Sequence, residues 1–167
     1  HPGTTYRYRG VKDGRPTLDV YAVSQTTKSI EGVPCVAVKD NLYEAGKLEE
    51  QTTDWYTQDN EGNVWYFGEA TRELDPQGRT TTTEGSWQAG VDGASPGIFM
   101  PAEPQPGQSY RQEYYKGQAE DQFKTQGQGK GSEISYVKSA VYNQADSKRG
   151  PEGALVFLGA KLSACAG

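Results

Sequence analysis

The side chains that could do chemistry in this sequence are mostly carboxylic acids and aromatic rings. The chain holds one histidine, His1, so a Ser-His-Asp or Cys-His catalytic site is close to excluded. No Gly-x-Ser-x-Gly elbow, phosphate-binding glycine loop or dinucleotide fingerprint is present. A carboxylate pair remains, for example Glu69 with Glu84 or Glu113. Because an acidic β-rich protein offers such pairs by chance, a non-catalytic function is favoured over a carboxylate-dependent hydrolase.

Calcium is the one cofactor that we consider, since hard cations take oxygen ligands. The wider set of candidates, which could converge with the carbonyls of residues 90–93, is Glu84, Asp92, Glu113, Glu120 and Asp121. From these we select Asp92, Glu113 and Asp121 as the calcium candidates. The alternative is that Asp92 caps its own loop, while the other carboxylates are solvated or paired with arginines. Otherwise we expect no cofactor.

The strongest local pattern is a turn flanked by two aromatic runs, in residues 54–69. Its Gly62 can take a positive φ, which is typical of a three-residue hairpin loop with a bulge. Such a loop places Asp59 opposite Asn63 and Thr57 opposite Trp65. The acidic loop looks superficially like a calcium loop, but it lacks the twelve-residue spacing. An Asx-stabilised turn is therefore the favoured interpretation.

Alternation along the two arms predicts that both faces of this hairpin are aromatic. Trp55, Trp65 and Phe67 share one face, whereas Tyr56 and Tyr66 share the other with Val64. We therefore expect a central hairpin, with a core on one side and a second layer or a cavity on the other. Aromatic rings with polar tips suit a pocket for a lipid, an aromatic molecule or a sugar. The predicted ligand-binding residues are Trp55, Tyr56, Trp65, Tyr66, Trp87 and Tyr114. The alternative is that these rings fill the core.

The bulk composition indicates an all-β protein. The chain has 167 residues, 21 glycines, 11 tyrosines and one methionine, which fits a twisted sheet with many turns better than a helical bundle. Its net charge of −5 argues against a nucleic-acid partner. No stretch approaches the ~20 apolar residues of a transmembrane segment. We predict one domain over residues 1–167, an antiparallel meander of roughly nine to eleven strands with little helix, curled into a barrel, half-barrel or sandwich.

Alternating and β-branched runs give the strand boundaries. The expected strands of the first half are 4–9, 17–30, 33–44, 48–59 and 64–74. In the second half we expect strands at 79–87, 108–116, 134–143 and 154–162, a short apolar segment at 98–100, and a polar Gly- and Gln-rich loop or linker at 124–132.

The two cysteines, Cys35 and Cys165, are far apart in the sequence. A disulfide between them would suit an exported protein and would close a long loop. The alternative is one buried thiol and one thiol near the C-terminus. The sequence starts His1-Pro2-Gly3 without a methionine, so we expect a processed or trimmed chain.

Several motifs occur in the order found in one bacterial family. They include Asp54-Trp55-Tyr56, residues 62–69, Glu84-Gly85-Ser86-Trp87, residues 89–94 and Tyr110-Arg111-Gln112-Glu113-Tyr114-Tyr115. On these motifs the chain resembles a family of bacterial β-proteins, mostly predicted to be exported or lipid-anchored, which has no assigned activity. The resemblance covers most of the chain, and the last quarter departs from the pattern. It implies a β fold and export to the periplasm, the cell surface or the medium, with a lipid anchor in the precursor of some members.

Three functions follow as hypotheses. The first is a non-catalytic exported protein that binds a small or amphiphilic ligand, such as a lipid-like molecule, on the concave aromatic face of its sheet. The second is a structural or accessory subunit of a cell-envelope or extracellular assembly, which docks on a protein partner through strand edges and the loops of residues 90–106. An exposed apolar patch at residues 98–100 would favour the second. The third is a carboxylate-dependent hydrolase.

Overall fold

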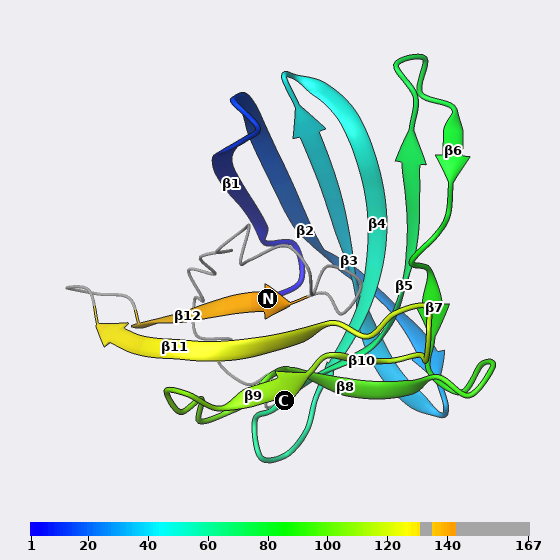
Figure 1. The fold of residues 1–167 in the computed structure, drawn as a ribbon. Coiled ribbons are helices and arrows are strands. Elements are labelled where there is room, and N and C mark those ends of the chain that lie inside the picture. Colours follow the sequence, from blue (N-terminus) through cyan, green and yellow to red (C-terminus); the bar gives the residue numbers. More distant parts are fainter. Residues whose placement is uncertain (131–134, 143–167) are drawn as a thin grey trace. The chain divides into compact units, whose positions relative to one another are not determined.

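The computed structural model describes residues 1–130 and 135–142, which form strands and turns and contain no helix (Figure 1). Twelve strands, β1 to β12, lie in these residues, and their pairings are antiparallel. The prediction of an all-β antiparallel meander is confirmed. None of the described segments forms a helix that is long and apolar enough to cross a membrane.

The chain divides into two compact units. The first contains residues 1–57 and 67–94, and the second contains residues 58–66 and 95–167. Strand β5 contributes to both, because its first three residues belong to the second unit. The prediction of a single domain stays a prediction.

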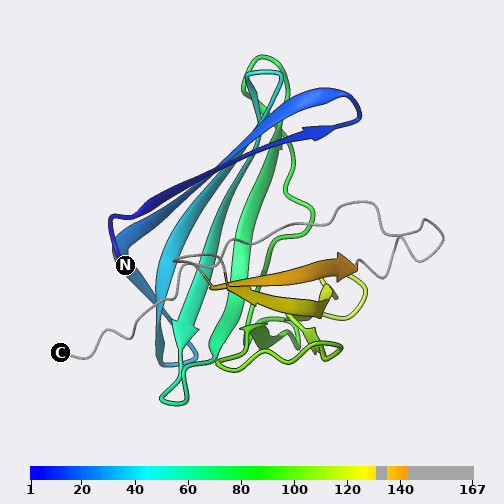
Figure 2. The ribbon, with the colours of Figure 1, turned by 90° about the vertical axis from the view of Figure 1, so that its left-hand side faces the viewer.

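The first unit is built on a meander of long neighbouring strands, whose sheet curls as a half-barrel (Figure 2). Its strands are β1 (Thr5–Lys12), β2 (Arg15–Ile30), β3 (Val33–Glu44), β4 (Lys47–Gln58) and β5 (Val64–Leu74), with the short β6 (Thr80–Thr82) and β7 (Trp87–Gln88) paired to β5. The bounds of β3 are those expected from the sequence. The starts of β1 and β2 and both ends of β4 differ from the expected positions by one or two residues, whereas β1 ends three residues later than expected.

Two-residue turns join the first four strands. The turn residues are Asp13-Gly14, Glu31-Gly32 and Ala45-Gly46, and both residues of each turn have positive φ. A pair of positive φ values is the type I′ geometry, whose twist matches that of the flanking strands. The second position of each turn is glycine, which adopts this conformation without steric cost. These turns set the register of the residues next to them, and the register shifts between Val23 and Thr27 in the β2–β3 pair and between Leu42 and Tyr43 in the β3–β4 pair.

That register separates two faces of the sheet, since directly paired residues share a face and neighbours along a strand do not. One row of paired residues runs Tyr6, Tyr21, Asp40 and Thr52 across β1 to β4. We call this side the carboxyl face; it also carries Tyr8, Asp19, Val38, Asp54 and Tyr56. The opposite side, which we call the lysine face, carries Lys28, Cys35, Lys39 and Trp55.

The second unit has shorter strands. They are β8 (Ser95–Met100), β9 (Ser109–Arg111), β10 (Glu113–Tyr114), β11 (Gln122–Lys130) and β12 (Ser135–Tyr142). Strand β8 pairs with residues 64–66 of β5 and with β10, and β11 lies between β9 and β12. Phe123 is buried and stacks on Tyr110, with 5.1 Å between the ring centroids. Gly97 permits the close approach of β8, because a Cβ atom there would overlap the carbonyls of Arg111 and Gln112.

Three expected segments differ from the structure. The strand expected at 79–87 is interrupted by a turn in which the Ser86 amide donates to the Thr83 carbonyl. The strand expected at 108–116 breaks at Gln112, because β9 pairs with β11 while β10 pairs with β8. The predicted loop or linker at 124–132 is wrong for residues 124–130, which belong to β11. Backbone pairing with β12 along the strand, and with β9 at residues 122–124, forms this strand despite a polar sequence without alternation.

The turn of the central hairpin follows the prediction. The Asp59 amide donates to the Asn63 carbonyl and the Gly62 amide to the Asp59 carbonyl, which closes a three-residue loop. The Asp59 carboxylate accepts hydrogen bonds from the amides of Glu61 and Asn63, from Asn63 Nδ2 and from Trp65 Nε1, at 2.8 to 3.0 Å. Hydrogen bonds from Trp65 and Asn63 lower the pKa of Asp59 to about 2. Each carboxylate oxygen thus has two donors, and the acid organises the turn.

We expect Asp59→Ala to destabilise the protein at neutral pH, because four donors lose their shared acceptor. The Asp59 pKa is depressed from 3.8 in the folded state, so its stabilisation is present above that value and is lost as the pH falls through about 2. Urea unfolding at several pH values measures this effect. We expect the difference in unfolding free energy between the wild type and the variant to become smaller from pH 4 to pH 2. Asn60→Ala, an exposed neighbour, is the control. A deficit that does not change with pH would contradict the assignment.

Candidate functional site

The most unusual chemistry in the first unit is a pair of carboxyl groups on the carboxyl face. Asp40 of β3 pairs directly with Tyr21 of β2, and Asp19 is the diagonal neighbour two residues before Tyr21. The Oδ1 atoms of both carboxyl groups are buried, and neither has a hydrogen-bond partner within the described residues. A hydrogen bond between two carboxyl groups requires a proton on one of them. Burial, followed by the hydrogen bond and negative charge of Asp19, raises the pKa of Asp40 to about 9.

Tyr21 completes this group. Its hydroxyl hydrogen-bonds the Asp40 side chain, a contact that lowers the Asp40 pKa in opposition to burial. Burial raises the pKa of Tyr21 far above 10, and the charges of Asp40 and Asp19 act in the same direction. Tyr21 is therefore a neutral hydrogen-bond donor. On β1, Tyr8 pairs with Asp19. Burial and the neighbouring Tyr6 and Asp19 raise the pKa of Tyr8.

A second acid lies beside the pair on β4. Asp54 pairs with Val38, two residues from Asp40, and is 4 % exposed. Its charge contributes to the raised pKa of Asp40 and of Tyr56. Burial is the largest cause of the shift at Tyr56, and the charge of Glu69 on β5 adds to it. The carboxyl face thus holds several acids and phenols, of which Asp54 is buried and Asp19, Tyr21, Asp40 and Tyr56 are half-buried.

Polar contacts continue this face toward β5. The hydroxyls of Thr52 and Thr71 hydrogen-bond at 2.7 Å, and Thr52 also donates to Glu50 at 3.2 Å. Glu69, two residues before Thr71, pairs with the buried Trp87 of β7. Aromatic rings therefore lie next to acceptor oxygens on this side of the sheet.

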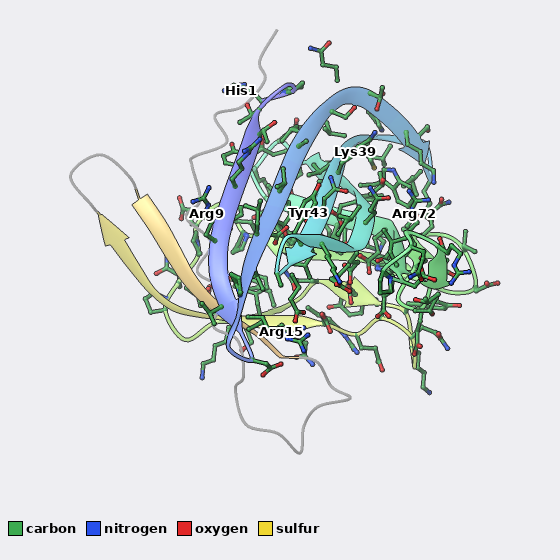
Figure 3. The ribbon with its side chains drawn as sticks, turned by 90° about the horizontal axis from the view of Figure 1, so that it is seen from above. His1, Arg9, Arg15, Lys39, Tyr43 and Arg72 are labelled. Carbon is green, nitrogen blue, oxygen red and sulfur yellow. The ribbon has the colours of Figure 1, made fainter. Side chains whose placement is uncertain are left out.

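The lysine face has a different composition. Lys28 Nζ lies 3.6 Å from the centroid of the Trp55 ring and donates to Gln88 Oε1 at 2.7 Å. A desolvated cation–π contact of this kind contributes about 1 to 2 kcal/mol. Figure 3 labels Arg9, Lys39 and Arg72, which come from β1, β3 and β5. The register places Arg9 and Lys39 on the lysine face, whereas Lys12 and Arg15, next to the first turn, share the face of the carboxyl pair.

The predicted ligand-binding residues do not share one face. Tyr56 lies on the carboxyl face, where Trp87 flanks Glu69, whereas Trp55 lies on the lysine face. The remaining three belong to the second unit. There Trp65 binds Asp59, Tyr66 is buried against Phe99, and Tyr114 is exposed beneath Arg111. Binding by these six residues stays a prediction.

The calcium candidates lie in different parts of the chain. Asp92 has positive φ in an exposed loop of the first unit. In the second unit, Glu113 Oε2 accepts a hydrogen bond from the Asp121 amide at 3.1 Å, and Glu120 pairs with Arg111. Within residues 1–130 and 135–142, no three acidic, cysteine or histidine side chains are grouped so as to hold a metal ion. Calcium binding stays a prediction.

The Cys35 thiol is buried on the lysine face, and its Sγ atom lies 3.5 Å from the Val33 carbonyl oxygen. Burial raises the pKa of Cys35 to about 11, so the thiol is protonated and unreactive at neutral pH. Cys165, the other member of the predicted disulfide, lies outside the described residues, as does the strand expected at 154–162.

The carboxyl pair was not among the residues predicted from the sequence. Asp19 and Asp40 stand in runs dense in strand-forming residues, where a charged side chain is normally placed on a solvated face. The available signal was their phase: in the expected alternation, Asp40 shares a face with the apolar Val36 and Val38. An acid in phase with apolar residues of a strand indicates a buried polar group.

Comparison with known proteins adds no identity to this geometry: no protein-family model, curated protein or solved structure matches the chain.

We expect Tyr21→Phe to raise the pKa of Asp40 further, because the variant loses the hydrogen bond that lowers it. Titration of the side-chain carboxyl carbons by NMR measures this shift directly. Tyr8→Phe is the matched control, since Tyr8 faces Asp19 and is not among the causes of the Asp40 shift. An Asp40 pKa that stays unchanged or falls in Tyr21→Phe would contradict the contact. The lost hydrogen bond costs about 1 kcal/mol of folding free energy.

Proposed function

We propose that the protein binds a small or amphiphilic ligand, without catalysis, on the carboxyl face of its curled sheet. The observation that supports this most directly is that the face is buried and polar at once: Thr52 is 6 % exposed and Asp54 4 % exposed. A sheet face that served only as a core would carry apolar side chains, because burying polar groups costs free energy. Polar groups in a covered region are typical of a ligand site.

The side chains on this face define the chemistry of the ligand. Carboxyl oxygens of Asp19 and Asp54 are acceptors, and the phenols of Tyr21 and Tyr56 add apolar ring surface. A matching molecule has an apolar part and at least one hydroxyl or amine that donates hydrogen bonds. We assign the carboxyl face as the concave one, because a curled sheet encloses the residues of its concave face more closely.

Hydrolysis ranks below binding. The carboxyl groups of glycosidases stand about 5 to 10 Å apart, with the scissile bond or a water molecule between them. Asp19 and Asp40 are instead diagonal neighbours on adjacent strands, and the Asp19 carboxyl contributes to the raised pKa of Asp40, which does not match that arrangement. The proton of the pair is held by burial, which opposes its transfer at neutral pH.

Docking on an assembly also ranks below binding. The apolar segment at residues 98–100 is half-buried within β8. Phe99 packs edge-on against Tyr66, with 5.9 Å between the ring centroids. The exposed apolar patch that would favour docking is therefore not formed by this segment. The resemblance to exported and lipid-anchored bacterial proteins supports a location outside the cytoplasm, where such a protein would carry or sequester its ligand.

Native mass spectrometry of protein purified without denaturation tests the proposal. We expect an added mass of a few hundred daltons that disappears when the protein is denatured. A mass increase of about 40 daltons instead would indicate calcium. Protein that carries no adduct and also fails to bind the dye N-phenyl-1-naphthylamine would contradict the proposal.

Neighbouring residues of β4 give a matched pair of variants, because Tyr56 and Trp55 lie on opposite faces. With the neutral amphiphilic dye N-phenyl-1-naphthylamine as the probe, we expect Tyr56→Ala to weaken binding about tenfold, as for a central aromatic contact. Trp55→Ala should leave the dissociation constant unchanged within about twofold. Far-UV circular dichroism and thermal melts check that both variants fold. Equal effects of the two substitutions would place binding elsewhere.

A further inference from the structure

The carboxyl pair connects two long strands of the first unit. Asp19 belongs to β2 and Asp40 to β3. Asp40 pairs directly with Tyr21, and Asp19 stands two residues before Tyr21, so the two acids are diagonal neighbours on one face. Both Oδ1 atoms are buried, and in the described part of the chain neither meets an N–H or hydroxyl donor. Two ionised carboxylates in this position would repel one another, and each would hold an unsatisfied buried oxygen. The arrangement is therefore stable only while a proton lies between the two groups.

The groups that face the pair cannot replace that proton. Around the pair, the titratable side chains on this face are Tyr6 and Tyr8 from β1, Tyr21 from β2, Glu50, Asp54 and Tyr56 from β4 and Glu69 from β5, which are all acids or phenols. The cations that the register places on this face, Lys12, Arg15 and Lys47, stand next to the turns at residues 13–14 and 45–46. At the β1–β2 and β3–β4 turns, Arg15 is paired with Glu44 at 2.9 Å. This arginine stands four residues from Asp19 along β2, toward the turn.

We propose that Asp19 and Asp40 form a proton-operated latch between β2 and β3, which closes while the pair holds its proton and loosens this part of the sheet when the proton leaves. The latch depends only on the geometry of the sheet and is independent of the proposed ligand. Protonation then controls how closely the two strands and their side chains pack.

The direction of the pH dependence follows from linkage. The Asp40 pKa is raised from 3.8 to about 9 in the folded protein, so the folded state holds the proton more tightly than the unfolded chain does. The contribution of the latch to stability is therefore fully present below pH 3.8 and decreases as the pH rises toward about 9. Above that value the pair is ionised and the latch is open.

Asp40→Asn tests the latch, because its amide keeps an N–H donor toward Asp19 at every pH. Urea midpoints of the full chain, read from tryptophan fluorescence, are compared at pH 4, 7 and 9. We expect the variant to match the wild type within error at pH 4 and to unfold at progressively higher urea than the wild type at pH 7 and pH 9. Glu73→Gln, which removes an exposed carboxylate of β5, should follow the wild-type curve. Parallel curves for the wild type and Asp40→Asn would overturn the proposal.

A measurement on the wild-type protein tests the latch even where a variant fails to fold. Carboxyl-carbon NMR should show one aspartate that titrates near pH 9, together with a simultaneous change in the tyrosine signals of β2. Asp19→Asn should move that midpoint down, because it removes the negative charge that contributes to the shift. Titration of every aspartate below pH 5 in the wild type would overturn the latch.

Discussion

The structure depends on the register of four long antiparallel strands, which three two-residue turns and two irregularities within the strands determine. Because side chains alternate along a strand, a shift of one residue would exchange the two faces of the sheet completely. The type I′ turns at residues 13–14, 31–32 and 45–46 fix the pairing next to them, and the register shifts between Val23 and Thr27 and between Leu42 and Tyr43 set the pairing farther along the strands. The separation of acids from lysines follows from that register.

The separation has an electrostatic consequence. Lys28 and Lys39 lie on one face of the sheet, while Asp19, Asp40 and Asp54 lie on the other. Burial and the neighbouring carboxyl groups raise the pKa of Asp40, which favours its protonated form. A buried polar group of this kind does not stabilise the fold as well as an apolar side chain would. Its presence on a covered face is the reason that we assign function to that face.

The second unit uses side chains in a different way. Asp59 accepts four hydrogen bonds within one turn, and Glu113 and Glu120 bind the Asp121 amide and Arg111. These acids have donors close by, so their role in the described structure is to organise turns and short strands. Asp75 anchors a turn of the first unit in the same way, by accepting from the amides of Gln77 and Arg79, so the Asp19–Asp40 pair is the feature that distinguishes the acids of the first unit.

The sequence alone determined the all-β class, the Gly-containing turns, the bounds of β3 and the Asp59 turn, because each depends on residues within a few positions of one another. Tertiary structure decided the partner change at Gln112, the pairing of β11 and the meeting of Asp19 with Asp40. Each of these depends on which strands become neighbours, and a polar segment such as residues 124–130 carries no alternation from which its partners can be read. The carboxyl pair is 21 residues apart in the chain and forms only when the register of β2 and β3 places both acids on one covered face.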